Sequence, residues 1–172
     1  MTGTTTVPLD EVAAYLDAML RTSEVPDYRG AMNGIQVEHV GPVTRCAVAV
    51  DVSSRTIEGA IAQGANLLIV HHGLFWGGTQ PIRGHVYERL RGLITHDVAL
   101  YASHLPLDLH PTVGNNALLA RELGLSPDSG FGRFESIDVG VKGTSDVATA
   151  TLVERCERLS RREGGQLVAV GA

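Results

Sequence analysis

Apolar positions near the N-terminus repeat first with the spacing of a helix and then with that of a strand. In residues 8–20, "PLDEVAAYLDAML", apolar side chains recur at positions 12, 16, 19 and 20, which form one face of a helix. Asp10 and Glu11 lie in its first turn, where the helix dipole favours negative charge. A stretch rich in turn residues covers 21–34, and "IQVEHV" at 35–40 suits a short strand.

From residue 45 onward, short apolar runs alternate with helical patterns. Strands are predicted at 45–51, 66–71 and 98–103, and helices at 54–65, 84–97 and 115–125. Ser53 or Ser54 suits the N-cap of the first of these helices, and Gly64 suits its end. Apolar strands separated by helices are typical of βαβ units. We therefore predict the α/β class, with a parallel or mixed sheet and helices on both of its faces.

The pattern changes after Gly124. Residues 131–145 suggest one or two strands with glycine turns, 146–165 a long helix, and 166–172 a final strand. The chain has 172 residues, of which 44% are hydrophobic and 19% charged, a balance typical of globular proteins. This length suits a single α/β domain over residues 1–172.

Charge and cysteine content exclude several classes of protein. The formal net charge is −5, and the basic stretch that begins at Arg158 is interrupted by Glu163, so no nucleic-acid-binding face is predicted. The apolar runs are too short to span a membrane. Cys46 and Cys156 form no close-spaced pair, and the N-terminus does not resemble a signal peptide. These features favour a cytoplasmic protein.

Side chains that can bind metal ions follow three of the predicted strands. The first strand ends in Asp51, the second in His71 and His72, and the third leads into a loop that contains His104 and Asp108. Because the carboxyl ends of parallel strands meet at one edge of a sheet, we expect these side chains to converge. Imidazole and carboxylate ligands suit Zn, Fe or Mn, and a carboxylate can bridge two such ions.

Each of these residues also has a simpler interpretation. Asp51 suits the N-cap of the following helix, and Asp108 suits the cap of a turn. Adjacent histidines on a regular strand point to opposite faces, so both serve one site only if the backbone turns, which Gly73 allows. Trp76 suits packing or a pocket wall. No GxSxG elbow or phosphate-binding glycine motif favours another chemistry.

Four longer segments together form a recognisable pattern. They are "MNGIQVE" at 32–38, "AVAVDVS" at 47–53, "ANLLIVHHGLFWGG" at 65–78 and "YASHLPLDLHPTVGNNALLARELGL" at 101–125. In this order they resemble the GTP cyclohydrolase I type 2 homologue family, also called the Nif-three-like or dinuclear-metal-centre hexameric proteins. The resemblance implies the Nif-three-like fold.

The resemblance also implies a site, a cofactor and an assembly. His71 and His72 would each bind one of two divalent ions, and Asp108 would be a further ligand. His104 would line the site, either supporting a ligand from behind or acting as an acid/base group. The chain would assemble into homohexamers and act as a metal-dependent hydrolase that opens the purine ring of GTP or acts on a similar nucleotide. The alternative is a non-catalytic metal-binding or scaffold protein.

The family's C-terminal motif has no counterpart in this sequence. Members complete the metal centre with a His and a Glu from a "GHxxxE"-type motif, whereas this sequence ends at "GGQLVAVGA". We therefore expect either a fragment of a longer protein or a shortened member with an incomplete centre.

Overall fold

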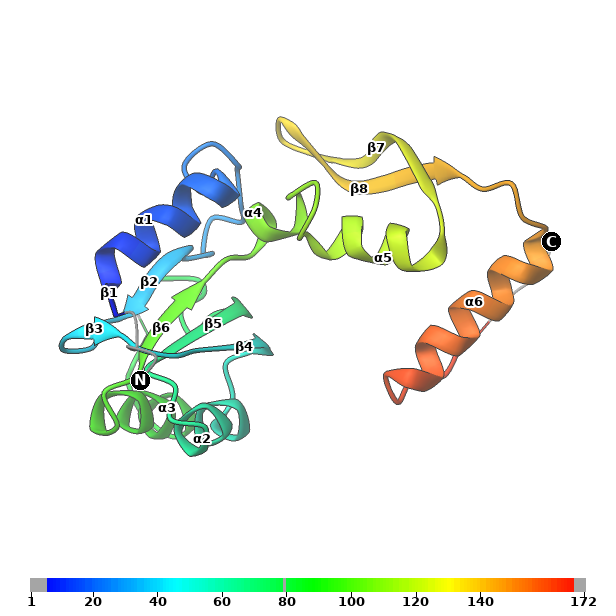
Figure 1. Cartoon of the computed structure of the whole chain (residues 1–172). Coiled ribbons are helices and arrows are strands. Elements are labelled where there is room, and N and C mark those ends of the chain that lie inside the picture. The colour runs from blue at the N-terminus through cyan, green and yellow to red at the C-terminus, as the bar shows by residue number, and fades with distance from the viewer. Residues whose placement is uncertain (1–5, 79, 169–172) are drawn as a thin grey trace. The chain divides into compact units, whose positions relative to one another are not determined.

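The structure, a computed structural model, describes residues 6–78 and 80–168 (Figure 1). It divides into two compact units, Met1–Leu107 and Asp108–Ala172. Its elements, in chain order, are β1 (Val7–Pro8), α1 (Leu9–Leu20), β2 (Gly34–Val37), β3 (Pro42–Val43), β4 (Cys46–Asp51), α2 (Ser54–Ala62), β5 (Leu67–His72), α3 (His85–Thr95), β6 (Ala99–Ala102), α4 (Leu105–Asp108), α5 (Asn115–Leu123), β7 (Ser126–Phe134), β8 (Ile137–Thr144) and α6 (Thr149–Arg162). That the whole chain is a single domain stays a prediction.

A four-stranded mixed sheet organises the first unit. Its strand order is β2-β6-β5-β4, in which β4, β5 and β6 run parallel and β2 runs antiparallel to β6. Helix α1 lies on one side of this sheet, and α2 and α3 lie on the other (Figure 1). The predicted α/β class, with helices on both faces of a mixed sheet, is confirmed.

The central strands are apolar up to the two histidines that end β5, because both faces of these strands are buried. On β5, Leu68 and Val70 join the core formed with α2 and α3, whereas Leu67 packs on the α1 side. On β6, Leu100 and Tyr101 divide between the two cores in the same way. Successive side chains of a strand point to opposite faces, so the two helix layers need an apolar residue at every position.

The predicted elements agree with the structure except near the C-terminus. In the second unit, β7 and β8 pair as an antiparallel hairpin, and β7 begins at Ser126, earlier than expected. Residues 166–168 form no strand, and the rest of the strand predicted at 166–172 lies outside the described residues. In the described part of the chain, no helix has the length and hydropathy needed to cross a membrane.

A partly buried hydrogen bond joins α1 to the sheet. The Tyr101 hydroxyl donates to Asp17 Oδ1 over 2.7 Å, and Tyr101 is almost wholly buried. Burial and the neighbouring Asp17 carboxylate both raise the pKa of Tyr101, which keeps the hydroxyl protonated as the donor. This contact fixes α1, and with it the start of the loop after α1, against β6.

Tyr101→Phe is expected to destabilise the first unit. The substitution keeps the ring in the core but removes the donor from Asp17. Hydrogen bonds to charged groups contribute more than neutral ones, so the free energy of unfolding is expected to fall by about 1.5–3 kcal/mol. Urea denaturation measures it, with Tyr15→Phe on the exposed side of α1 as the matched control. Equal midpoints for the two variants would contradict this role.

Candidate metal centre

Three histidine rings converge at the carboxyl edge of the sheet. His71 and His72 end β5, and His104 follows β6. Ring centroids lie 4.4 Å apart for His71 and His72 and 4.8 Å apart for His71 and His104. One ligand nitrogen from each ring lies within 4.8 Å of the other two. Around one zinc ion, ligand nitrogens lie at most about 4 Å apart, so small ring rotations would let all three bind a single ion.

The parallel pairing of β5 with β6 brings these residues together. Val70 pairs with Ala102 at the end of the ladder, so the residues that follow lie at the same edge of the sheet. β5 continues through His72, and the chain leaves the sheet at Gly73. The rings of His71 and His72 lie side by side at this edge, although neighbouring positions on a regular strand face opposite ways.

Each of the three rings is oriented by an oxygen atom at Nδ1. His71 Nδ1 lies 3.1 Å from the carbonyl oxygen of Ser103. His72 Nδ1 lies 2.7 Å from Asp51 Oδ1, and His104 Nδ1 lies 2.8 Å from Asp27 Oδ1. A carbonyl or carboxylate oxygen accepts, so Nδ1 carries a proton, and in the neutral imidazole Nε2 then keeps its lone pair. Histidines that bind metals commonly donate from the other ring nitrogen in this way.

Asp27 is the more buried of the two carboxylate acceptors. Its side chain is 7% exposed, and its carboxylate accepts hydrogen bonds from Asn33 Nδ2 and from the backbone N–H groups of Tyr28 and Leu105, besides His104. Burial by itself would raise the pKa of the Asp27 carboxyl. The hydrogen bonds from Asn33, His104, Tyr28 and Leu105 outweigh burial and lower that pKa below its ordinary value. A charged carboxylate is thus held beside His104.

Asn33 links Asp27 to the backbone at His104. Its Nδ2 donates to Asp27 Oδ2 over 2.9 Å, and its Oδ1 accepts from the N–H of His104 over 2.7 Å. One amide side chain therefore positions both partners of the His104–Asp27 pair.

Two aspartates that the sequence suggested for the site, Asp51 and Asp108, have contacts that differ from those expected. The interpretation of Asp51 as a helix cap is wrong: Ser53 caps α2 in a capping box with Thr56, and the Asp51 side chain contacts His72 instead. Asp108 belongs to the second unit, where its Oδ1 accepts a hydrogen bond from Asn115 Nδ2 over 2.7 Å. Its role as a further metal ligand stays a prediction, as does the acid/base role of His104.

The loop after the histidine pair is fixed by a side chain that sequence reasoning missed. Gln36 Oε1 accepts from the N–H of Leu74 over 2.6 Å, and Gln36 Nε2 donates to the carbonyl oxygen of Met32 over 2.6 Å. A Cβ atom on Gly73 would collide with the Gln36 amide. Gly73 therefore lets β2 approach the turn closely, in addition to allowing the chain to leave the sheet.

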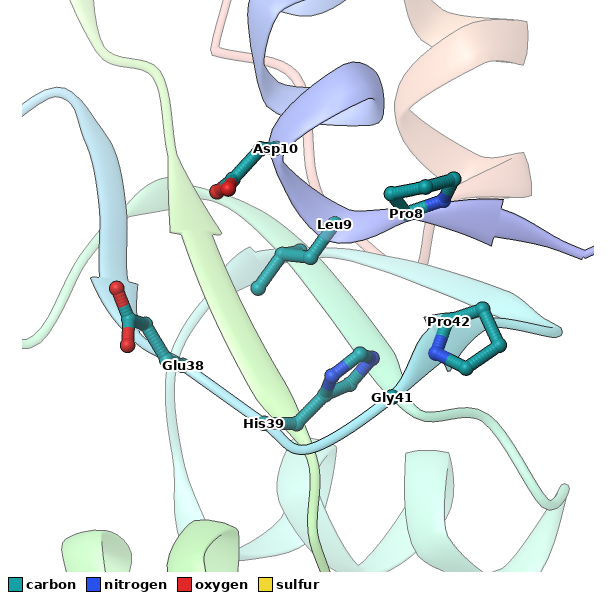
Figure 2. Close-up of a pocket in the computed structure, with 7 residues that line it drawn as sticks. All are labelled: Pro8, Leu9, Asp10, Glu38, His39, Gly41 and Pro42. Atoms are coloured by element: carbon teal, nitrogen blue, oxygen red, sulfur yellow. The ribbon is translucent and has the colours of Figure 1, made fainter.

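A cavity away from the histidine cluster also contains ionisable groups. It has a volume of about 370 Å³, and Asp10, Glu38 and His39 line it. The carboxylates of Asp10 and Glu38 lie apart from each other in Figure 2. Glu38 follows the end of β2, which runs antiparallel to β6, so this cavity is at the opposite edge of the sheet from the histidines. Among the described residues, these groups do not form a set of three donors close enough for a metal ion.

The fold and site define a class: an α/β protein with a cluster of three histidines that could hold a metal ion. The Duf34/NIF3 (NGG1p interacting factor 3) family profile matches residues 7–170. The chain belongs to this family. The resemblance inferred from the sequence motifs is confirmed, and the solved relatives confirm the Nif-three-like fold.

Relatives cover most of this chain. It is 40% identical over 161 residues to the GTP cyclohydrolase 1 type 2 homolog of Deinococcus radiodurans, covering 92% of this chain and 60% of that protein. It is 46% identical over 135 residues to the homolog of Treponema pallidum, covering 78% and 47%. A crystal structure of a Thermus thermophilus protein is 40% identical, with a TM-score of 0.81, over 93% of this chain and 63% of that one. The matches span about half to three fifths of the curated relatives.

Asp51→Asn is expected to weaken metal binding without unfolding the protein. Asp51 is 66% exposed, so the substitution leaves the core intact, but the charged acceptor of His72 Nδ1 is lost. Losing the hydrogen-bond acceptor that orients a metal-binding histidine typically lowers metal affinity about 10- to 100-fold. Competition for Zn²⁺ with a chelator measures the affinity, and Asp10→Asn, an exposed carboxylate at the other edge of the sheet, is the control. Equal affinity in both variants would show that Asp51 does not orient a ligand.

Proposed function

We propose that this chain binds a divalent metal ion through His71, His72 and His104 and acts as a metal-dependent hydrolase. The observation that carries the proposal is the oxygen acceptor at Nδ1 of every ring, which leaves Nε2 as the metal-binding atom. Three imidazoles suit Zn, Fe or Mn, and three protein ligands are the usual number at a catalytic zinc. The name of the curated relatives, GTP cyclohydrolase 1 type 2 homolog, supports a nucleotide as the substrate.

The chemistry would be divided between the ion and the side chains. A divalent ion supplies Lewis-acid chemistry that polarises a substrate and makes a water molecule more acidic. The three imidazoles would hold the ion, while Asp27 and Asp51 hold two of the rings in place. Asp108 would add an oxygen ligand and allow a second ion. Assembly into a homohexamer, implied by the family resemblance, is part of the same proposal.

A second candidate function is metal binding without catalysis. All three histidines have the contact pattern of metal ligands, including His104, which the sequence suggested as the acid/base group. If all three bind the ion, no histidine of the cluster is left to move a proton. The protein would then store, deliver or be organised by the metal.

Metal content tests the site itself. Protein purified without a metal-binding tag is expected to hold about one ion per chain in this cluster, and about two if Asp108 completes a second site. The His71→Ala/His72→Ala variant is expected to lose the bound metal, because two of the three histidine ligands are gone. His85→Ala/His96→Ala removes two exposed histidines outside the cluster and is the control. Elemental analysis that finds equal metal in both variants would overturn the proposal.

His104→Ala separates the two candidate functions. If His104 is a ligand, metal content falls in parallel with any turnover of GTP or related nucleotides. If it is an acid/base group, metal content stays and turnover falls by about 100- to 10,000-fold. The structure favours the first result, since His104 Nδ1 is hydrogen-bonded to Asp27 as a ligand's would be. Elemental analysis and a product assay across nucleotides, on metal-loaded protein, measure both quantities.

A further inference from the structure

A larger cavity lies beside the histidine cluster in the first unit. Its volume is about 560 Å³, within the range of small-molecule sites. The apolar side chains that line it include Met32, Ile35, Leu74, Phe75, Trp76 and Ile82. The cavity lies between the segment before and within β2 and the loop that follows β5.

Hydrogen bonds between these two segments hold the cavity walls. Gln36 Oε1 accepts from Leu74 N–H, and the N–H of Gly77 donates to the carbonyl oxygen of Gly30 over 3.2 Å. The Trp76 indole N–H donates to the carbonyl oxygen of Gly73 over 3.0 Å, which fixes the plane of the ring. The cavity is therefore pre-formed, and a ligand would not have to organise its walls.

No charged residue is among the described residues that line this cavity. Gln36 and Gln80 supply its polar side chains, and both amides bond to the walls: Gln80 Nε2 donates to the carbonyl oxygen of Trp76 over 3.1 Å. A phosphate or carboxylate buried here would lose its hydration without gaining a cationic partner, which is strongly unfavourable. An uncharged ligand group does not incur this penalty.

Trp76 is a wall shared by the cavity and the histidine cluster. Its ring stands edge-on to His104, with centroids 4.9 Å apart and planes at 88°, and lies 6.3 Å from the ring of His72. A group that fills the cavity would therefore lie about one ring width from the histidines. Aromatic rings favour such offset or edge-to-face contacts with other rings.

We propose that this cavity binds the uncharged aromatic or heteroaromatic ring of a ligand. The polar part of the same ligand would reach the histidine cluster. The flat apolar surfaces of Phe75 and Trp76 suit a ring. The proposal rests on the proposed function, because it assigns a substrate class to the same site. For a nucleotide, it places the base in the cavity and the phosphates outside it.

Binding of indole to the metal-free protein tests this assignment. Indole is an uncharged ring without a basic nitrogen that would bind the metal. Saturation-transfer NMR on the full chain is expected to detect it, with binding at least tenfold weaker in Ile82→Glu, which introduces a carboxylate into the cavity. Ile94→Glu on α3 is the matched control, since Ile82 and Ile94 are 60% and 65% exposed but only Ile82 lines the cavity. Binding is expected to persist in Ile94→Glu and in His71→Ala/His72→Ala.

The outcomes separate this proposal from the proposed function. Metal binding without indole binding, or equal indole binding by the Ile82→Glu and Ile94→Glu variants, overturns the ring pocket and leaves the metal site standing. Indole binding that Ile82→Glu abolishes supports the pocket. If the unsubstituted protein binds indole but holds no metal, the proposed function fails while the ring pocket remains.

Discussion

The candidate site depends on one kind of contact: an oxygen atom placed at Nδ1 of each histidine. An imidazole turns freely about its side-chain bonds unless something fixes it, and a ring of unknown orientation offers no defined ligand atom. The Ser103 carbonyl, Asp51 and Asp27 each fix one ring, and each favours the tautomer with a lone pair on Nε2. The metal-binding character of the cluster comes as much from these oxygens as from the histidines.

The fold delivers these oxygens from separate parts of the chain. Asp51 ends β4 and pairs with His72 across the parallel ladder, so the sheet register itself places it. Ser103 follows β6 directly. Asp27 lies in the loop between α1 and β2, and both ends of that loop are fixed, because α1 packs on the sheet and β2 pairs with β6. The loop therefore brings a buried carboxylate to His104 across 77 residues of sequence.

The sequence could predict the sheet edge and its histidines but not how they are oriented. The uninterrupted apolar runs before Asp51, His71 and His104 identify parallel strands, and such strands necessarily end at one edge. Asp51 fits both a site residue and a helix cap in the sequence, because an aspartate before a helix is often a cap, and the structure assigns the cap to Ser53. Asp27 lies in an irregular loop with no periodic pattern to mark it, and its contact depends on long-range packing.

The tautomers of the three rings decide whether these oxygens orient the histidines as metal ligands. Long-range ¹⁵N–¹H NMR correlation on metal-free protein reports which ring nitrogen carries the proton in each histidine. Protonated Nδ1 and unprotonated Nε2 are expected for His71, His72 and His104, because each Nδ1 faces an oxygen acceptor. An Nε2-protonated tautomer in any of the three would mean that the ring is held in another way, and would contradict the proposed ligand set.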